Sequence, residues 1–365
     1  MSTNVRLKAD TSVFITSAYS DAEPVSSFLQ AAKESSRTRY RLTDDADEAD
    51  LILFIENSRY HKDRYFRKLK NHPLVRNYPQ KVFMYNPHDT PWLVLPGLYA
   101  SMPKQRFDNK VIAACNYVEV INPYVRCDFD RQPTYLFSFC GTPYRGVRFR
   151  IAKLTHPRAA INAFAANMYG HGRKNEPMRN YAELLVDSKF ILCPKGIGTS
   201  SIRLFEVLKA GRVPVIISDN WVPPKGPDWQ NIAVFVPEHA TDQIPQLLEK
   251  EEHQWEQKAR AARAAWEQYF SPDVVLNYMI EQILELKNLS NYKMPLALKL
   301  AHLKAKGHFR FRFFKQQVKV AVQSVSRVLS QYGIRLTLLL TWLKLLVYAI
   351  VDELGSVHIF SLFAI

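Results

Sequence analysis

A chain of 365 residues has room for two domains, and its 47% hydrophobic and 12% aromatic content excludes a chain that is disordered throughout. The net charge of +15 suggests nucleic acid, a membrane surface or anionic substrates. Nine of the excess positive charges, however, lie between Lys299 and Arg335, a stretch without Asp or Glu, so the basic character belongs mainly to a C-terminal tail.

The first part of the chain alternates strands with helices. Apolar and β-branched runs predict strands at residues 12–17, 39–43, 51–56 and 81–86, and helical spacing predicts helices at 24–33 and 63–69. One more strand is expected within 113–122. This order implies βαβ units and a parallel sheet, whose ligands bind beyond the carboxyl ends of the strands. Those ends carry Ser17, Thr43, Glu56, His88 and Asp89.

A second alternating region follows a linker at residues 127–134. We predict strands at 135–140, 190–193, 213–218 and 231–238, and helices at 159–168, 181–186, 242–250, 256–270 and 272–287. The chain is therefore expected to have three parts. These are an N-terminal Rossmann-like lobe (1–131), a C-terminal Rossmann-like lobe (132–290) and a basic, apolar helical tail (291–365).

The stretch between residues 189 and 219 predicts an anion site. The strand FILC leads into the loop PKGIGTS, and a helix then begins near Ser200 or Ser201 and ends at Gly211. The first turn of a helix leaves backbone N–H groups unpaired and carries a partial positive charge. Glycines in the loop let the backbone approach a ligand closely, so the pattern suits a diphosphate.

Arg203 and Glu206 strengthen this prediction. A cation in the first helical turn opposes the helix dipole, which makes sense if an anion binds there. Arg203 would hold phosphate oxygens, and Glu206, three residues on and on the same helix face, would accept hydrogen bonds from ribose hydroxyls. The alternative is an ordinary surface ion pair between the two residues.

Several stretches resemble one family. The run SKFILCPKG…SSIRLFEVLKAGRVPVIISD resembles the signature of the exostosin-like glycosyltransferases of family 47, which is roughly S-K-F-x-L-x-P-x-G, then S-x-R-x-x-E, then G-x-V-P-V-I-I-S-D. Upstream, EADLILFIE and YLFSFCGTPYRGVR resemble further elements of the family in the same order. The resemblance covers about residues 44–238 and is most specific over the last 50 of them.

The resemblance implies the GT-B architecture, with two Rossmann-like lobes around a cleft, the first for the acceptor and the second for a nucleotide-sugar donor. On this basis the expected donor-binding residues are Arg145, Lys195, Gly196, Ser201, Arg203 and Glu206. Lys195 departs from many relatives, which have a small polar residue at that position. It either adds a phosphate contact or points to solvent.

The resemblance also implies an inverting transferase that moves a hexose or pentose from a nucleotide-sugar to a glycan or lipid-linked acceptor, in polysaccharide or glycoconjugate biosynthesis. Helix N–H groups, Arg203 and Arg145 would stabilise the leaving diphosphate without a metal or other cofactor. The base that takes the acceptor proton should project from the first lobe. The candidates there are Glu56, His88 and Asp89, although Asn-Pro-His-Asp is also a turn sequence.

Other interpretations remain open or are disfavoured. A catalytically silent exostosin-like subunit that binds a partner or glycan stays possible on sequence grounds, and the α1,3-fucosyltransferase superfold ranks second among transferases. The strings Asp45-Ala-Asp47 and Asp128-Phe-Asp130 lie in a turn and a linker, so we expect solvated carboxylates and no metal site. A nucleic-acid binder is disfavoured, because the α/β body offers no surface of interleaved basic and aromatic residues.

The tail and the cysteines concern location. Residues 336–351 form an apolar run of sixteen residues interrupted by Lys344, and a helix of that length spans about 24 Å, short of a hydrocarbon core of ~30 Å. We expect a helix lying in an anionic membrane interface, with a helical pair packed on the body as the alternative. Four cysteines without a disulfide pattern, and an N-terminus without a signal-like apolar segment, indicate the cytoplasm, at the inner face of the membrane if the tail binds there.

Overall fold

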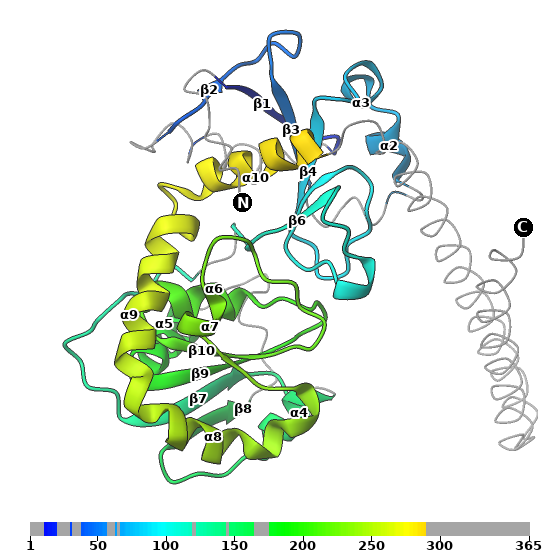
Figure 1. The fold of residues 1–365 in the computed structure, drawn as a ribbon. Coiled ribbons are helices and arrows are strands. Elements are labelled where there is room, and N and C mark those ends of the chain that lie inside the picture. Colours follow the sequence, from blue (N-terminus) through cyan, green and yellow to red (C-terminus); the bar gives the residue numbers. More distant parts are fainter. Residues whose placement is uncertain are drawn as a thin grey trace, which may run out of the picture. The chain divides into compact units, whose positions relative to one another are not determined.

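The structure is a computed structural model, and it describes residues 11–19, 30, 38–56, 63, 66–118, 122–143, 146–163 and 175–289. Three features predicted from the sequence lie outside these residues. They are the helix at 24–33, of which only Gln30 is described, Arg145 and the C-terminal tail. The description below therefore concerns the two α/β regions between residues 11 and 289 (Figure 1).

The first region is built on a six-stranded sheet with the order β2-β1-β3-β4-β5-β6, in which every neighbouring pair is parallel. Its strands are β1 (Ser12–Thr16), β2 (Arg41–Leu42), β3 (Leu51–Ile55), β4 (Val82–Asn86), β5 (Gly97–Tyr99) and β6 (Ile112–Ala114). Short helices lie between them, namely α2 (Arg67–Lys70), α3 (Pro73–Asn77) and the 3-10 helix η3 (Lys104–Arg106). Every residue of β3 and β4 is buried, as their continuous apolar runs predict.

The second region is built on a five-stranded parallel sheet with the order β11-β10-β9-β7-β8. Its strands are β7 (Tyr135–Gly141), β8 (Ala159–Ala163), β9 (Ser188–Pro194), β10 (Val213–Ile217) and β11 (Val234–Phe235). The α-helices are α4 (Val147–Ile151), α5 (Asn175–Val186), α6 (Ile202–Lys209), α7 (Trp229–Ile232), α8 (Ile244–Glu251) and α9 (Trp255–Ala265). Shorter helical segments are η4 (Glu238–Gln243), η5 (Glu252–Gln254) and the π-helical η6 (Trp266–Phe270). Two separate parallel sheets confirm the predicted α/β class with two Rossmann-like lobes.

One prediction in the second lobe is wrong. The sequence predicts that residues 159–163 begin a helix, but they form strand β8. This strand pairs in parallel with β7, with Ala159 opposite Phe137 and Ala163 opposite Gly141. The three alanines in this segment favour a helix by propensity alone. Pairing with the buried strand β7 overrides that weak local preference.

Helix α10 (Val275–Leu289) follows the second lobe in sequence but packs against β5 and β6 of the first sheet. Its apolar stripe, which includes Met279 and Ile283, is buried. Two hydrogen bonds add to this contact, from Arg39 N to Asn277 Oδ1 (3.0 Å) and from Lys287 Nζ to Asp50 O (2.9 Å). The chain thus returns to the first lobe at its end, because the apolar side of α10 finds its partner there.

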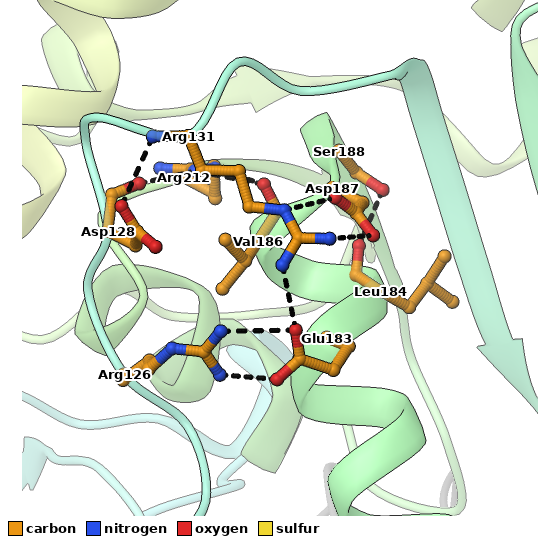
Figure 2. Close-up of polar contacts among 9 residues, drawn as sticks. All are labelled: Arg126, Asp128, Arg131, Glu183, Leu184, Val186, Asp187, Ser188 and Arg212. Atoms are coloured by element: carbon orange, nitrogen blue, oxygen red, sulfur yellow. Dashed lines mark hydrogen bonds and ion pairs between the residues drawn. The ribbon is translucent and has the colours of Figure 1, made fainter.

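The linker between the lobes is held against the end of α5 (Figure 2). Arg131 contacts Glu183 (Nη1–Oε2, 2.9 Å) and Asp187 (Nε–Oδ1, 2.8 Å). Beneath them Arg212, which is fully buried, donates to the carbonyl oxygens of Val186 (Nη2–O, 2.8 Å) and Asp128 (Nη2–O, 2.8 Å). This set of bonds fixes the linker on the second lobe.

Candidate active site

The loop between β9 and α6 is fixed by backbone bonds at the carboxyl edge of the second sheet. Lys195 N donates to Ile217 O (3.0 Å), Gly196 N donates to Gly198 O (3.2 Å), and Ser218 Oγ donates to Thr199 O (2.8 Å). Helix α6 begins after Ser201, whose side chain makes no capping hydrogen bond. The first turn of α6 therefore directs backbone N–H groups toward the loop without a side-chain cap, as an anion site requires.

Arg203 lies in the first turn of α6 and is only 7% exposed. Its Nη2 donates to Cys140 O at the end of β7, and its guanidinium lies 5.1 Å from the centre of the Phe139 ring. A Cβ on Gly141 would lie 2.9 Å from the same Nη2. The residue that the sequence singled out is therefore placed beside the Gly turn that follows β7.

A second arginine, Arg148 on α4, joins the site. Its Nε donates to Lys195 O (2.9 Å), and a Cβ on Gly196 would lie 3.1 Å from its Nη2. Arg145, the arginine expected here from the sequence, lies outside the described residues. Arg148 and Arg203 thus bring two guanidinium groups to Gly141 and Gly196, a combination that suits a diphosphate.

Glu206 is fully buried, and both of its carboxylate oxygens accept hydrogen bonds from protein groups. Oε1 accepts from Asn122 N (2.9 Å), which precedes the linker, and Oε2 accepts from the Tyr181 hydroxyl (3.0 Å) on α5. The carboxylate therefore ties the segment at Asn122 and helix α5 to α6. A ribose hydroxyl reaches it only by sharing or displacing one of these donors, and the predicted ribose contact stays a prediction.

Lys195 is paired with an acidic residue that the sequence analysis missed. Its Nζ lies 2.5 Å from Glu238 Oε2, and Glu238 also accepts a bond from Asp219 N (Oε1, 3.1 Å). Asp219 Oδ1 in turn accepts from Glu238 N (3.0 Å). Since these residues follow β9, β10 and β11, the topology gathers them at one sheet edge, although they are far apart in sequence.

The loop of the second lobe touches the first lobe at Ser101 and Asp89. A Cβ on Gly198 would lie 2.3 Å from Ser101 Oγ and 2.7 Å from Asp89 O, so only glycine fits this contact. Ser200 N donates to Ser101 Oγ (3.1 Å), and Thr199 Oγ1 donates to Ser101 O (3.2 Å). The loop before α6 thus faces residues of the first lobe directly.

The three candidate bases end up in different surroundings. Asp89 is partly exposed, accepts a bond from the Tyr117 hydroxyl at Oδ1 (2.9 Å) and lies beside Gly198. His88 accepts a bond from Thr90 N at Nδ1 (3.0 Å), and burial lowers its pKa. Glu56 is fully buried at the end of β3. Asp89 contacts the loop through its backbone, at Gly198, while its carboxylate accepts the bond from Tyr117.

The environment of Glu56 predicts a pH-dependent stability. Burial raises its pKa to about 7, against the lowering effect of the bonds from Ala18 N (2.9 Å) and Ser17 Oγ (3.2 Å). A carboxyl whose pKa is raised on folding favours the folded state below its unfolded pKa, and that contribution is lost as the pH rises through 7. The free energy of unfolding should therefore fall by about 2.5 kcal/mol from pH 5 to pH 8 relative to Glu56→Gln.

Urea unfolding of both proteins at pH 5, 6, 7 and 8 checks this expectation. The informative quantity is the difference between wild type and Glu56→Gln at each pH, since other titrating groups contribute equally to both. A constant difference across the four pH values would contradict the raised pKa.

The two D-x-D strings serve turns. Asp45 Oδ1 accepts from Asp47 N (2.8 Å), Asp47 Oδ1 accepts from the Tyr78 hydroxyl (2.5 Å), and Asp128 Oδ1 accepts from Arg131 N (3.1 Å). Within the part of the chain that the structure describes, no group of three or more His, Cys, Asp or Glu side chains is arranged to hold a metal ion.

Part of the chain is similar to known proteins. Residues 101–250 match the family model of the Exostosin GT47 domain. A stretch of 70 residues, 19% of this chain, is 44% identical to an Exostosin-1 homolog of Caenorhabditis elegans and covers 18% of it. A stretch of 94 residues, 25% of this chain, is 35% identical to Exostosin-2 of Bos taurus and covers 13% of it. The chain thus matches less than a fifth of the length of these relatives.

Among solved structures, a glycosyltransferase from Rickettsia africae aligns with 78% of this chain and 100% of its own, at a TM-score of 0.39 and 9% identity. We draw nothing from a likeness of that degree. The match to the family model is the informative comparison, because residues 101–250 include Ser101, Gly141, the loop between β9 and α6, and α6 itself. This match over residues 101–250 confirms the resemblance seen in the sequence. The two parallel sheets agree with the two Rossmann-like lobes that the resemblance implies.

Proposed function

We propose that this protein is an inverting glycosyltransferase that moves a sugar from a nucleoside diphosphate sugar to a glycan acceptor, without a metal or other cofactor. The observation that carries the proposal is the placement of Arg203 and Arg148 beside Gly141 and Gly196, at the uncapped start of α6. Two guanidinium groups and a helix start are suited to a diphosphate, and the exostosin GT47 domain supplies the class of reaction.

In the proposed reaction, an acceptor hydroxyl attacks the anomeric carbon of the donor sugar while the bond from that carbon to the diphosphate oxygen breaks. Negative charge grows on the leaving diphosphate, and Arg203, Arg148 and the N–H groups of α6 stabilise it. We assign the base to Asp89, to which the proton of the acceptor hydroxyl would pass. This choice is supported by the contact between the backbone of Asp89 and Gly198 in the loop between β9 and α6.

A panel of nucleoside diphosphate sugars, with UDP, GDP, ADP or dTDP as the nucleotide, tests the proposal. A ligand that binds only the folded state raises the melting temperature, so at least one member should do so, and slow hydrolysis of that donor should be detectable. Binding without hydrolysis or transfer would favour the catalytically silent subunit instead. No binding by any member would contradict the proposal.

Replacing Asp89 distinguishes the candidate bases. We expect Asp89→Asn to lower kcat by about 10²–10⁴, the usual contribution of a positioned general base, with the donor KM little changed. Glu56→Gln serves as the matched control, because Glu56 is enclosed by Ser17 and Ala18. Steady-state transfer kinetics of both variants measure kcat, which should fall more in Asp89→Asn than in Glu56→Gln. A larger fall of kcat in Glu56→Gln would reverse the assignment.

We also propose that the tail, residues 291–365, holds the enzyme at an anionic membrane surface on the cytoplasmic side, beside a lipid-linked acceptor. Its nine basic residues between Lys299 and Arg335 would each contribute roughly 1 kcal/mol near such a surface. In the described part of the protein, no helix has both the length and the apolar character that a membrane crossing requires.

The expected result is that the full-length protein sediments with phosphatidylserine vesicles at low salt and that a protein ending at Asn291 does not. Vesicles of phosphatidylcholine alone provide the control for charge. If both proteins stay in the supernatant with anionic vesicles, the tail has no membrane role.

A further inference from the structure

Ile197, in the loop between β9 and α6, is an apolar residue whose side chain is exposed to solvent. Its exposed fraction is 71%, the highest among the large apolar residues that the structure describes as exposed, ahead of Phe149 and Phe235. The bond from Gly196 N to Gly198 O (3.2 Å) turns the loop around this residue, so Ile197 occupies its tip. A side chain in this position contributes nothing to the core and is available for a ligand.

The two neighbours of Ile197 mark the ends of the reaction site. On one side, Gly196 contacts Arg148, whose guanidinium belongs to the proposed diphosphate site. On the other side, Gly198 contacts the backbone of Asp89, the residue proposed as the base. The stretch from residue 196 to residue 198 spans at most about 7 Å, which is the length of one sugar ring with its substituents.

An in-line displacement requires the diphosphate, the transferred sugar and the base to lie in this order in space. The diphosphate leaves on one side of the anomeric carbon, and the acceptor hydroxyl with its base lies on the opposite side. The transferred sugar therefore lies between the Arg148 end and the Asp89 end of the loop, where Ile197 is exposed. Sugar rings have apolar faces of C–H groups, which an aliphatic side chain covers favourably.

We propose that Ile197 packs against the C–H face of the donor sugar and selects among donor sugars. The assignment rests on the proposed function and adds a specificity residue to it. Ile197 would contact the sugar and not the nucleotide, because the nucleotide lies beyond the diphosphate on the far side of Arg148. A polar or bulkier residue at this position should therefore change the ranking of sugars that share one nucleotide.

The test compares the Kd of a free nucleotide with the Kd values of the nucleotide-sugars that contain it. Calorimetry would measure the Kd of UDP or GDP, whichever the wild type binds, and of its conjugates with glucose, galactose, N-acetylglucosamine, glucuronate and xylose. Ile197→Ser should leave the Kd of the free nucleotide within twofold and weaken the preferred nucleotide-sugar about tenfold, within the range for losing apolar contacts to a substrate. Ile197→Val should show a smaller loss of the same kind.

Phe235→Ser is the matched control, since Phe235 is another exposed apolar residue of the second lobe, at 39%. It should change neither Kd. Equal weakening of nucleotide and nucleotide-sugar by Ile197→Ser would mean that the substitution deforms the diphosphate site, and unchanged binding of every sugar would mean that Ile197 does not contact it. Either result overturns the inference while the proposed function stands. A wild type that binds no nucleotide-sugar overturns both.

Discussion

Arg203→Ala is expected to lower the kcat of sugar transfer by about 10²–10³, the size of effect seen when one positioned group that stabilises developing charge is removed. Two features of Arg203 point to a bound anion. Its charge in the first turn of a helix opposes the dipole by roughly 0.3–1 kcal/mol, and its side chain is nearly buried beside Gly141. Such a placement is unfavourable for the free protein and becomes favourable when a diphosphate binds.

Two controls separate catalysis from folding. Arg203→Lys keeps the charge but loses the planar fork, so it should recover part of kcat and little of the bidentate binding. Arg158→Ala removes an exposed arginine of the same lobe that pairs with Glu252, and it should leave turnover unchanged. The melting temperature of each variant shows whether it folds. Wild-type turnover in a folded Arg203→Ala protein would remove Arg203 from the mechanism.

The strands with strong apolar runs could be predicted, while β5 could not. β3 and β4 are buried along their whole length, and their sequences are apolar except for Asn86 at the end of β4. β5 has only three residues and begins at Gly97, whose φ of 147° and close approach to the backbone of Met84 exclude a side chain. Three residues carry no readable period, and β5 is defined by its pairing with β4 and β6.

The candidate site shows the same division. Arg203 could be identified because a local rule, the helix dipole, is broken there. Glu238 carries no local signal, since only the strand order places it 2.5 Å from Lys195. Arg145 and Arg148 lie three residues apart in the sequence, and the sequence does not say which of them reaches the loop. Residues that act through tertiary contacts are the ones that sequence reasoning misses.

Arg212 is a further residue that the sequence did not reveal. It follows Gly211 at the end of α6, yet its side chain reaches back to the end of α5 and the linker (Figure 2). Nε and Nη2 both donate to Val186 O (3.2 and 2.8 Å), Nη1 donates to Gly211 O (2.9 Å), and Nη2 also donates to Asp128 O (2.8 Å). The guanidinium is satisfied by backbone carbonyls, which explains how a charged side chain is tolerated with no exposed surface.

Arg212→Met should therefore lower the free energy of unfolding by at least about 3 kcal/mol, because it leaves three carbonyl oxygens without this donor and each buried acceptor so orphaned costs about 1–3 kcal/mol. Arg126→Met is the control from the same network. Its side chain is 47% exposed and pairs with Glu183 on the surface, so its loss should stay below about 1 kcal/mol. Urea unfolding measures both, with the midpoint shifted and the slope unchanged. If the two variants lose equal stability, the linker is held by its surface ion pairs and not by the buried guanidinium.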